Sequence, residues 1–140
     1  MSAISAVTLV PGTAAGAVFV LVEPLSFWGG LDAATGAIID RWHPQCGEVL
    51  TGKVLLMERG RGSSSGSSVL AEAIRAGTGP AAILLLTRDA IVTLGALVAN
   101  ELYGTACPVA MVAAADWPAL AAAGRLAVEA GAEGATIGVA

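Results

Sequence analysis

A glycine- and serine-rich segment, Gly60 to Ser67 (GRGSSSGS), lies between two stretches with strong secondary-structure signals. Before it, Lys53 to Met57 (KVLLM) is a short apolar run of the kind that forms a buried strand. After it, apolar residues recur at helical spacing and predict a helix over Ser68 to Ala76. This order constrains the fold strongly, because a strand, a loop and a helix in succession form the basic unit of an α/β layer.

The rest of the chain changes from a β-rich pattern to an alternating one. Strands are expected in the first third, between Pro and Gly turn signals, at Ala6 to Val10, Gly16 to Val22 and Ala37 to Asp40. Later strands are expected at Ala81 to Leu86, Pro108 to Ala113, Arg125 to Glu129 and Ala135 to Val139. Two further helices are expected, Asp89 to Tyr103 ended by Gly104, and Trp117 to Ala123 capped by Asp116. The patterns predict one α/β domain over residues 1–140, a layered β/β/α arrangement with a barrel-like β part and flanking helices.

Composition narrows the possible partners. Hydrophobic residues make up 56% of the chain and charged residues 13%, so part of the surface is expected to be an interface. The net charge is -4 and the only Lys/Arg cluster is Arg59 and Arg61, which argues against nucleic-acid binding. No apolar stretch approaches the roughly 20 residues that span a bilayer, and the first residues lack a basic signal-peptide region. These features predict a cytoplasmic protein without a membrane span.

Cysteine and histidine usage argues against a metal site built by this chain alone. Cys46 and Cys107 lie far apart without a CxxC or Cys/His pattern, so both are expected to be reduced, part-buried thiols. His43 is the only histidine. It precedes proline, where a structural role is commoner than that of a base.

The serine-rich segment has two interpretations. Glycines allow close backbone approach to a ligand, and the N–H groups at the start of the following helix favour a carboxylate or phosphate. Such runs are also common as flexible linkers or simple helix caps. The packed elements expected at both ends favour a loop that is held in place. Arg61 in this loop has three interpretations: it binds a substrate carboxylate, it contacts an acidic partner surface, or it is a solvated charge.

Other candidate residues have structural explanations beside functional ones. Pro24 to Gly30 (PLSFWGG) is expected to be a loop that either plugs the barrel end with its aromatics or contacts a ligand or partner subunit. Glu72 is expected to interact with the helix dipole from the first turn. Turn formation explains the polar residues of the expected hairpin, Asp32, Thr35 and Asp40.

Several motifs taken together resemble the swivelling-domain small subunit of the aconitase X family. They are PLSFWGG at Pro24 to Gly30, TGAIID at Thr35 to Asp40, HP at His43-Pro44, GK at Gly52-Lys53 and GRGSSSGS at Gly60 to Ser67, and the match continues through Glu72, Gly77, Pro80 and the helix ending near Tyr103. The resemblance implies a swivelling β/β/α fold. It also implies a small subunit that docks on a large catalytic subunit to form a hydro-lyase, with the active site between them.

The resemblance also implies roles for residues of the loop. In aconitase-like enzymes the first serine of a Gly-Ser-Ser segment, as alkoxide, abstracts the proton α to a carboxylate, and the matching residue here is Ser63. The residues around it are then expected to bind substrate: Arg61, Gly62, Ser64, Ser65 and Gly66. The aconitase segment has arginine where this chain has Ser65, a departure that puts citrate-type recognition in doubt. An iron or iron-sulfur centre is implied on the large subunit, with none bound by this chain alone.

Two substrate classes fit this family, cis-3-hydroxy-L-proline, dehydrated to pyrroline-2-carboxylate, and 5-phosphomevalonate. Both carry a carboxylate and lose a β-hydroxyl. The chain has six arginines against one lysine and is rich in alanine, a composition typical of GC-rich bacteria, which favours hydroxyproline. A stand-alone swivelling or scaffold domain without catalysis is the alternative from another class.

Overall fold

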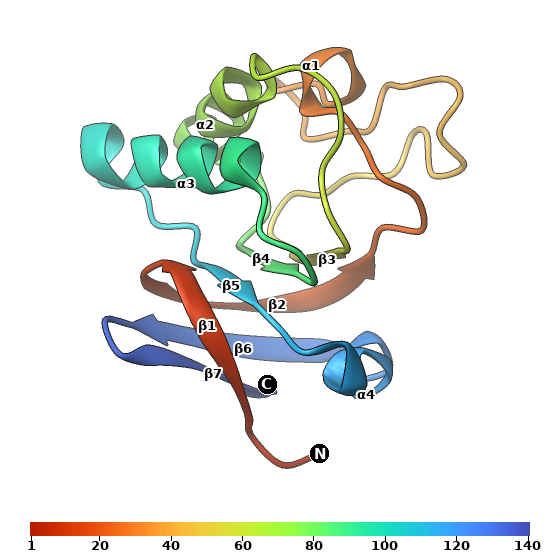
Figure 1. Ribbon diagram of the computed structural model, residues 1–140. Helices are drawn as coiled ribbons and strands as arrows, with labels where there is room; N and C mark the ends of the chain where they lie inside the picture. The colour runs from red at the N-terminus through yellow and green to blue at the C-terminus, as the bar shows by residue number, and fades with distance from the viewer.

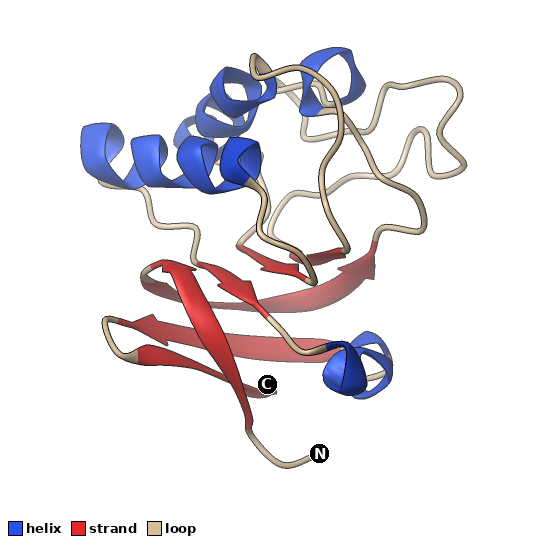
Figure 2. Ribbon diagram, in the orientation of Figure 1, coloured by secondary structure: helices blue, strands red, loops and turns tan.

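Seven strands close into a ring in the computed structural model, which describes residues 1–140, and the ring lies below a layer of helices (Figures 1 and 2). The strands are β1 (Ile4–Val10), β2 (Gly12–Val20), β3 (Val54–Met57), β4 (Ala82–Leu85), β5 (Val109–Met111), β6 (Arg125–Gly131) and β7 (Gly134–Val139). Their order around the ring is β1-β5-β4-β3-β2-β6-β7. The neighbours from β2 to β5 pair in parallel, and the remaining pairs are antiparallel.

The two N-terminal strands join the parallel and antiparallel parts of the ring. β2 pairs with β6 over residues 12–17 and with β3 over residues 18–20. β1 pairs with β7 over residues 4–6 and with β5 from Val7 onward. Each long strand therefore changes partner halfway along its length, and the sheet curves into a ring rather than a regular barrel.

The helices divide between two positions. They are α1 (Phe27–Gly30), α2 (Gly66–Ala76), α3 (Ala90–Tyr103), the 3-10 turn η1 (Ala114–Asp116) and α4 (Trp117–Ala121). Helices α1, α2 and α3 cover the parallel strands, while α4 lies beside the ring (Figure 1). α2 and α3 approach closely at Gly95, where an added Cβ would lie 2.9 Å from the Ser67 carbonyl oxygen. None of the helices is both long and apolar enough to cross a membrane.

Two hydrophobic cores lie on opposite sides of the parallel strands. All four residues of β3 are fully buried. Leu55 and Met57 belong to the core beneath the helices, while Val54 and Leu56 belong to the core inside the ring. β4 divides its apolar residues in the same way, which is why both strands are continuous apolar runs rather than alternating ones.

Most sequence-predicted elements are present, with shifted ends. The helix predicted from Ser68 begins two residues earlier, at Gly66, and the second predicted strand begins at Gly12 instead of Gly16. The predicted limits of α3 are confirmed by the Asp89 N-cap, whose carboxylate accepts two helix N–H bonds, and by Gly104 in the left-handed conformation.

Two local predictions are wrong. Residues 37–40 form no strand, because they make only isolated bridges, Leu31 with Ile38 and Ala37 with Val49, between tight turns. Asp116 does not cap α4, since its side chain accepts no cap hydrogen bond there. The segment Pro24 to Gly30 forms a loop as predicted, because the short element α1 within it has non-helical backbone at Trp28 (ψ of 115°) and Gly29 (φ of +77°).

Candidate functional site

The loop from Glu58 to Ser65, here called the serine loop, joins β3 to α2 at the carboxyl end of the parallel strands (Figure 1). This end of a parallel sheet is where α/β folds place ligand sites. The loop begins at a fully buried strand and ends at a helix whose Leu70 is fully buried. Its two ends are therefore fixed in the core, unlike those of a linker.

A carboxylate from the next βα connection fastens the start of the serine loop. The Gly60 N–H donates to Asp89 Oδ2 at 2.8 Å, while Asp89 Oδ1 accepts from the N–H groups of Ile91 and Val92 at 3.0 Å each. A Cβ on Gly60 would lie only 2.8 Å from Asp89 Oδ2. Asp89 thus ties the serine loop to the start of α3, a role that sequence reasoning missed because it recognised only the helix boundary.

The middle of the serine loop packs on the PLSFWGG segment. Gly62 has φ of +91°, and an added Cβ would clash with Ser26, lying 2.7 Å from the Ser26 Cβ. Both the backbone conformation and this contact require glycine. Phe27 is buried among the helix-side core residues, whereas Trp28 is 59% exposed. The segment therefore supports the serine loop, and its aromatics do not both form a plug.

The serine hydroxyls differ in their bonding. Ser63 Oγ accepts the Ser65 N–H at 3.1 Å, and Ser67 Oγ donates to the Ile91 carbonyl oxygen at 2.7 Å. The Ser64 and Ser65 side chains are exposed and make no hydrogen bond within the chain, so Ser65 at the N-cap position does not cap α2. Only Ser63 is half-buried with a backbone N–H directed at its oxygen.

Four consecutive N–H groups, Arg61 to Ser64, have no hydrogen-bond acceptor within the chain. The next N–H groups are used, because Ser65 bonds to the Ser63 hydroxyl and Gly66 to the Ser63 carbonyl at 3.0 Å. Free N–H groups in succession favour an anion, and so does the nearby helix N-terminus. The first turn of α2 contains no acidic residue that would compete for this position.

The predicted role of Glu72 is wrong, whereas that of Arg61 stays a prediction. Glu72 is not in the first turn of α2, because the helix begins at Gly66. It forms an ion pair with Arg75 instead, whose hydrogen bond lowers the pKa of the Glu72 carboxyl. Arg75 and Glu72 form the only ion pair in the chain. Arg61 is exposed and has no acidic partner, which leaves its guanidinium free for an external carboxylate.

His43 has a structural role. Its side chain is buried, with 6% exposed, and its Nδ1 accepts the Gln45 N–H at 3.1 Å. Its Nε2 must then carry the proton, which it donates to the Glu23 carbonyl oxygen at 3.0 Å. With both nitrogens bonded, the ring is not placed to act as a base. Turn formation is likewise confirmed for the predicted turn residues, since Asp32 accepts from Ala34 N–H and the Thr35 hydroxyl, and Asp40 accepts from Trp42 N–H.

The cysteines provide no metal site. Both are free, but neither is part-buried as predicted, because Cys46 is exposed and Cys107 is fully buried. Burial raises the pKa of the Cys107 thiol to about 12. No three His, Cys, Asp or Glu side chains are grouped so as to hold a metal ion.

Comparison with known proteins identifies the family of this fold and loop. A family model described as the aconitase X swivel domain matches residues 3–137. The chain belongs to this family. A solved structure of Thermococcus kodakaraensis aconitase X in its holo-form superposes with a TM-score of 0.81 at 26% identity, covering 100% of this swivel domain and 99% of that chain.

The swivel domain covers very different shares of two curated relatives. It is 50% identical over 103 residues to the cis-3-hydroxy-L-proline dehydratase of Pseudomonas aeruginosa, covering 74% of this chain but 18% of the relative. It is 46% identical over 89 residues to the phosphomevalonate dehydratase small subunit of Methanothermobacter thermautotrophicus, covering 64% of this chain and 68% of the relative. The swivel domain thus spans less than a fifth of the Pseudomonas dehydratase.

Proposed function

We propose that this swivel domain is the small subunit of an aconitase X-type hydro-lyase, in which the serine loop supplies the catalytic base. The observation that carries the proposal is the arrangement at Ser63, whose Oγ receives a backbone N–H and adjoins four unpaired N–H groups. Membership of the aconitase X swivel-domain family, and the naming of two relatives as dehydratases, support the same activity.

Ser63 is the proposed base. A serine hydroxyl is a weak base in water, so its anion has to be stabilised before it can take a proton from carbon. The Ser65 N–H at 3.1 Å from Ser63 Oγ favours the charged form of that oxygen. The α2 N-terminus adds positive potential without any acidic residue in its first turn. Preorganised donors of this kind contribute about 3–4 kcal/mol each to a developing anion.

The proposed reaction is a β-elimination. Ser63 Oγ takes the proton from the carbon α to the substrate carboxylate, and the electrons of that C–H bond form the α,β double bond. The bond from the β-carbon to its hydroxyl breaks, and the hydroxyl leaves as water after taking a proton from an acid on the partner. Arg61, Ser64 and Ser65, together with the free N–H groups at Gly62 and its neighbours, are proposed to hold the carboxylate, and Gly66 opens the helix beneath them.

The proposed substrate is cis-3-hydroxy-L-proline, which would give pyrroline-2-carboxylate. The higher identity to the Pseudomonas dehydratase and the arginine-rich, lysine-poor composition support it. Phosphomevalonate is the second candidate, supported by the identity to the Methanothermobacter small subunit. The iron or iron-sulfur centre is proposed to lie on the large subunit in the cytoplasmic complex, because this chain offers no group of metal ligands.

Reconstitution tests the proposal. The chain and the large aconitase X subunit from the same organism are purified separately, and each is assayed alone and mixed with both substrates. We expect no turnover by either protein alone and dehydration of hydroxyproline by the mixture. Turnover by the isolated chain would contradict the subunit role, and a mixture active on phosphomevalonate alone would replace the substrate. A mixture inactive on both would favour a non-catalytic scaffold.

A further inference from the structure

The most exposed large apolar side chain of the molecule is Trp42, at 95%. Its backbone is nevertheless fixed, because Trp42 N–H donates to Asp40 Oδ1 at 3.0 Å and the next residue, His43, donates its N–H to the Asp40 carbonyl at 3.1 Å. His43 is itself buried and bonded through both ring nitrogens. An ordered turn therefore presents an indole to solvent, where it contributes nothing to either core.

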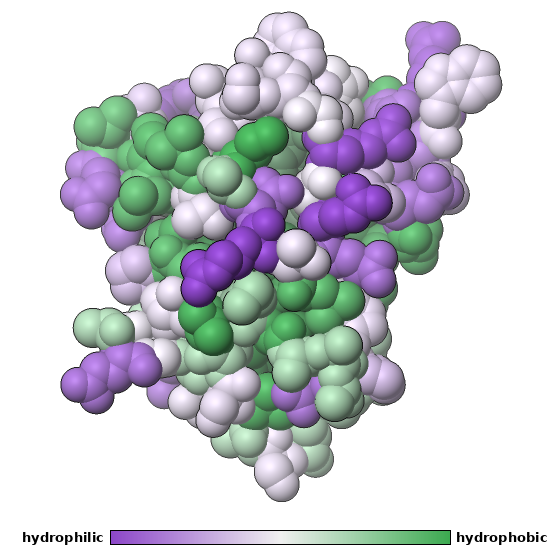
Figure 3. Space-filling view, in the orientation of Figure 1, coloured by the Kyte–Doolittle hydropathy of each residue, from purple (hydrophilic) through white to green (hydrophobic).

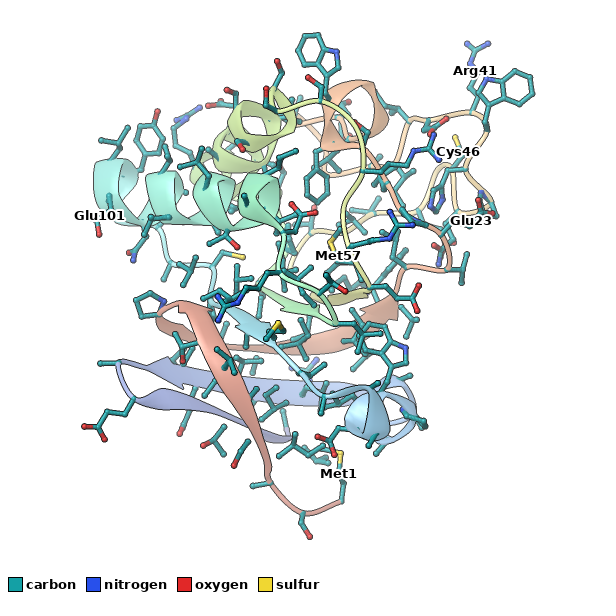
Figure 4. All side chains as sticks on the ribbon, viewed as in Figure 1. Met1, Glu23, Arg41, Cys46, Met57 and Glu101 are labelled. Carbon is teal, nitrogen blue, oxygen red and sulfur yellow. The ribbon has the colours of Figure 1, made fainter.

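This turn is continuous with the serine loop through α1. Ile39 N–H donates to the Gly30 carbonyl oxygen at 2.8 Å, which joins the turn to the end of α1. At the other end of the same segment, Ser26 packs against Gly62 of the serine loop. In Figure 4 the labelled Arg41 projects from this end of the molecule, on the side where α1 lies. A surface next to the serine loop thus extends from α1 to the Trp42 turn.

We define the tryptophan face as four exposed side chains along this path, which are Trp28, Ile39, Arg41 and Trp42. Trp28 is 59% exposed and Ile39 48%. Arg41 has no acidic ion-pair partner within the chain. Exposed tryptophan and unpaired arginine are the residue types most enriched at energetic hot spots of protein interfaces.

We propose that the tryptophan face docks on the large catalytic subunit, with Trp42 inserted in an apolar pocket and Arg41 facing an acidic rim. The inference rests on the proposed function, since it names the surface that brings the serine loop to its partner. Two observations point to this partner. The face is contiguous with the serine loop, which must meet the large subunit if the active site lies between them. The Pseudomonas relative carries most of its length outside the region matched here.

A second apolar surface lies over α3, where green side chains gather in Figure 3. It includes Leu94, Leu97 and Leu102, exposed by 52%, 37% and 69%. The C-terminal end of α3, which carries Leu102, lies at the opposite side of Figure 1 from the loop that joins α1 to β3. Leu102 is therefore a matched control, an exposed apolar side chain on a helix end far from the tryptophan face.

Binding affinity tests the proposal directly. Wild-type chain, Trp42→Ala, Arg41→Glu and Leu102→Ala are titrated against immobilised large subunit, and each is used to reconstitute activity. Hot-spot truncations of this type raise Kd by about 30-fold or more, and we expect this for Trp42→Ala. Arg41→Glu should weaken binding most at low salt, because exposed charges are screened by salt. Leu102→Ala should change Kd less than twofold.

Activity separates docking from chemistry. At saturating Trp42→Ala chain, kcat should equal that of the wild type, while half-maximal activity requires about 30-fold more chain. Circular dichroism and thermal melting should be unchanged, since the indole is exposed. If the wild-type pair is active and Trp42→Ala binds equally well, the tryptophan face is wrong and the proposed function stands. If the wild-type chain neither binds nor activates the large subunit, the proposed function fails as well.

Discussion

Replacing Ser63 by alanine separates the catalytic role of the serine loop from its structural one. The substitution removes one hydroxyl whose single hydrogen bond within the chain comes from the Ser65 N–H at 3.1 Å. The backbone bond from Gly66 N–H to the Ser63 carbonyl oxygen remains. A lost hydrogen bond at a half-buried position costs about 0.5–1.5 kcal/mol, so the loop and the docked complex should persist.

The expected loss of activity is larger than this structural effect. A positioned acid–base group contributes about 10²- to 10⁴-fold, or about 2.7–5.4 kcal/mol at 1.36 kcal/mol per factor of ten. A purely structural role for Ser63 would account for at most about tenfold. If turnover falls by about 100-fold or more while KM changes only a few-fold, the hydroxyl is identified as the base.

Steady-state kinetics of the reconstituted complex decides the question, with neighbouring serines as controls. Ser64→Ala and Ser65→Ala should mainly raise KM, because these exposed hydroxyls are proposed to hold the carboxylate. Ser68→Ala should have no effect, since that exposed side chain makes no hydrogen bond in the chain. Near-normal turnover for Ser63→Ala, with collapse in Ser64→Ala or Ser65→Ala, would refute the assignment and move the base to another residue of the loop.

Two further predictions concern other parts of the fold. Asp89→Ala removes two cap bonds of α3 and the Gly60 bond, and should lower the free energy of unfolding by about 2–3 kcal/mol, measured by urea denaturation. Asp89→Asn should lose less, and a loss below about 0.5 kcal/mol for alanine would contradict the anchoring role. In native protein at pH 8 a thiol reagent should modify Cys46 alone, because Cys107 is buried and its pKa is raised to about 12. Both thiols should react after unfolding without reductant, and finding neither reactive would show a disulfide.

Sequence patterns predicted those helices and strands whose position is set by their own residues. The cap at Asp89, the left-handed Gly104 and the apolar runs of β3 and β4 each fix an element from its own residues. The wrong strand at Ala37 to Asp40 shows where this reasoning stops. Its residues favour extended backbone, but tight turns at Asp32 and Asp40 leave it only single bridges, and no ring strand pairs with it. Whether an extended segment pairs with another strand depends on residues distant in sequence.

Long-range contacts of the serine loop could not be predicted from the sequence either. The sequence identified the candidate loop, since glycine and serine composition is visible in one segment; its proposed catalytic role stays a prediction. It did not predict that Asp89 fastens Gly60, or that Gly62 packs on Ser26, because these contacts join residues 29 and 36 positions apart in the chain. The glycines of the loop are thus required for two reasons, the positive φ of Gly62 and the close approach of two other connections.

The geometry of the serine loop also explains why the isolated chain should be inactive. Arg61, Gly62 and Ser64 are exposed, so water solvates their unpaired N–H groups as long as the chain is alone. Hydrated donors stabilise an anion weakly, because solvent screens them and competes for them. A partner that covers the loop would exclude this water and strengthen the same donors without moving them. The charge-poor composition fits such a partner, and so does the exposed Trp42, whose turn is joined to the loop through α1 and Ser26. Docking is then a precondition of catalysis, since the partner that covers the loop also desolvates the proposed base.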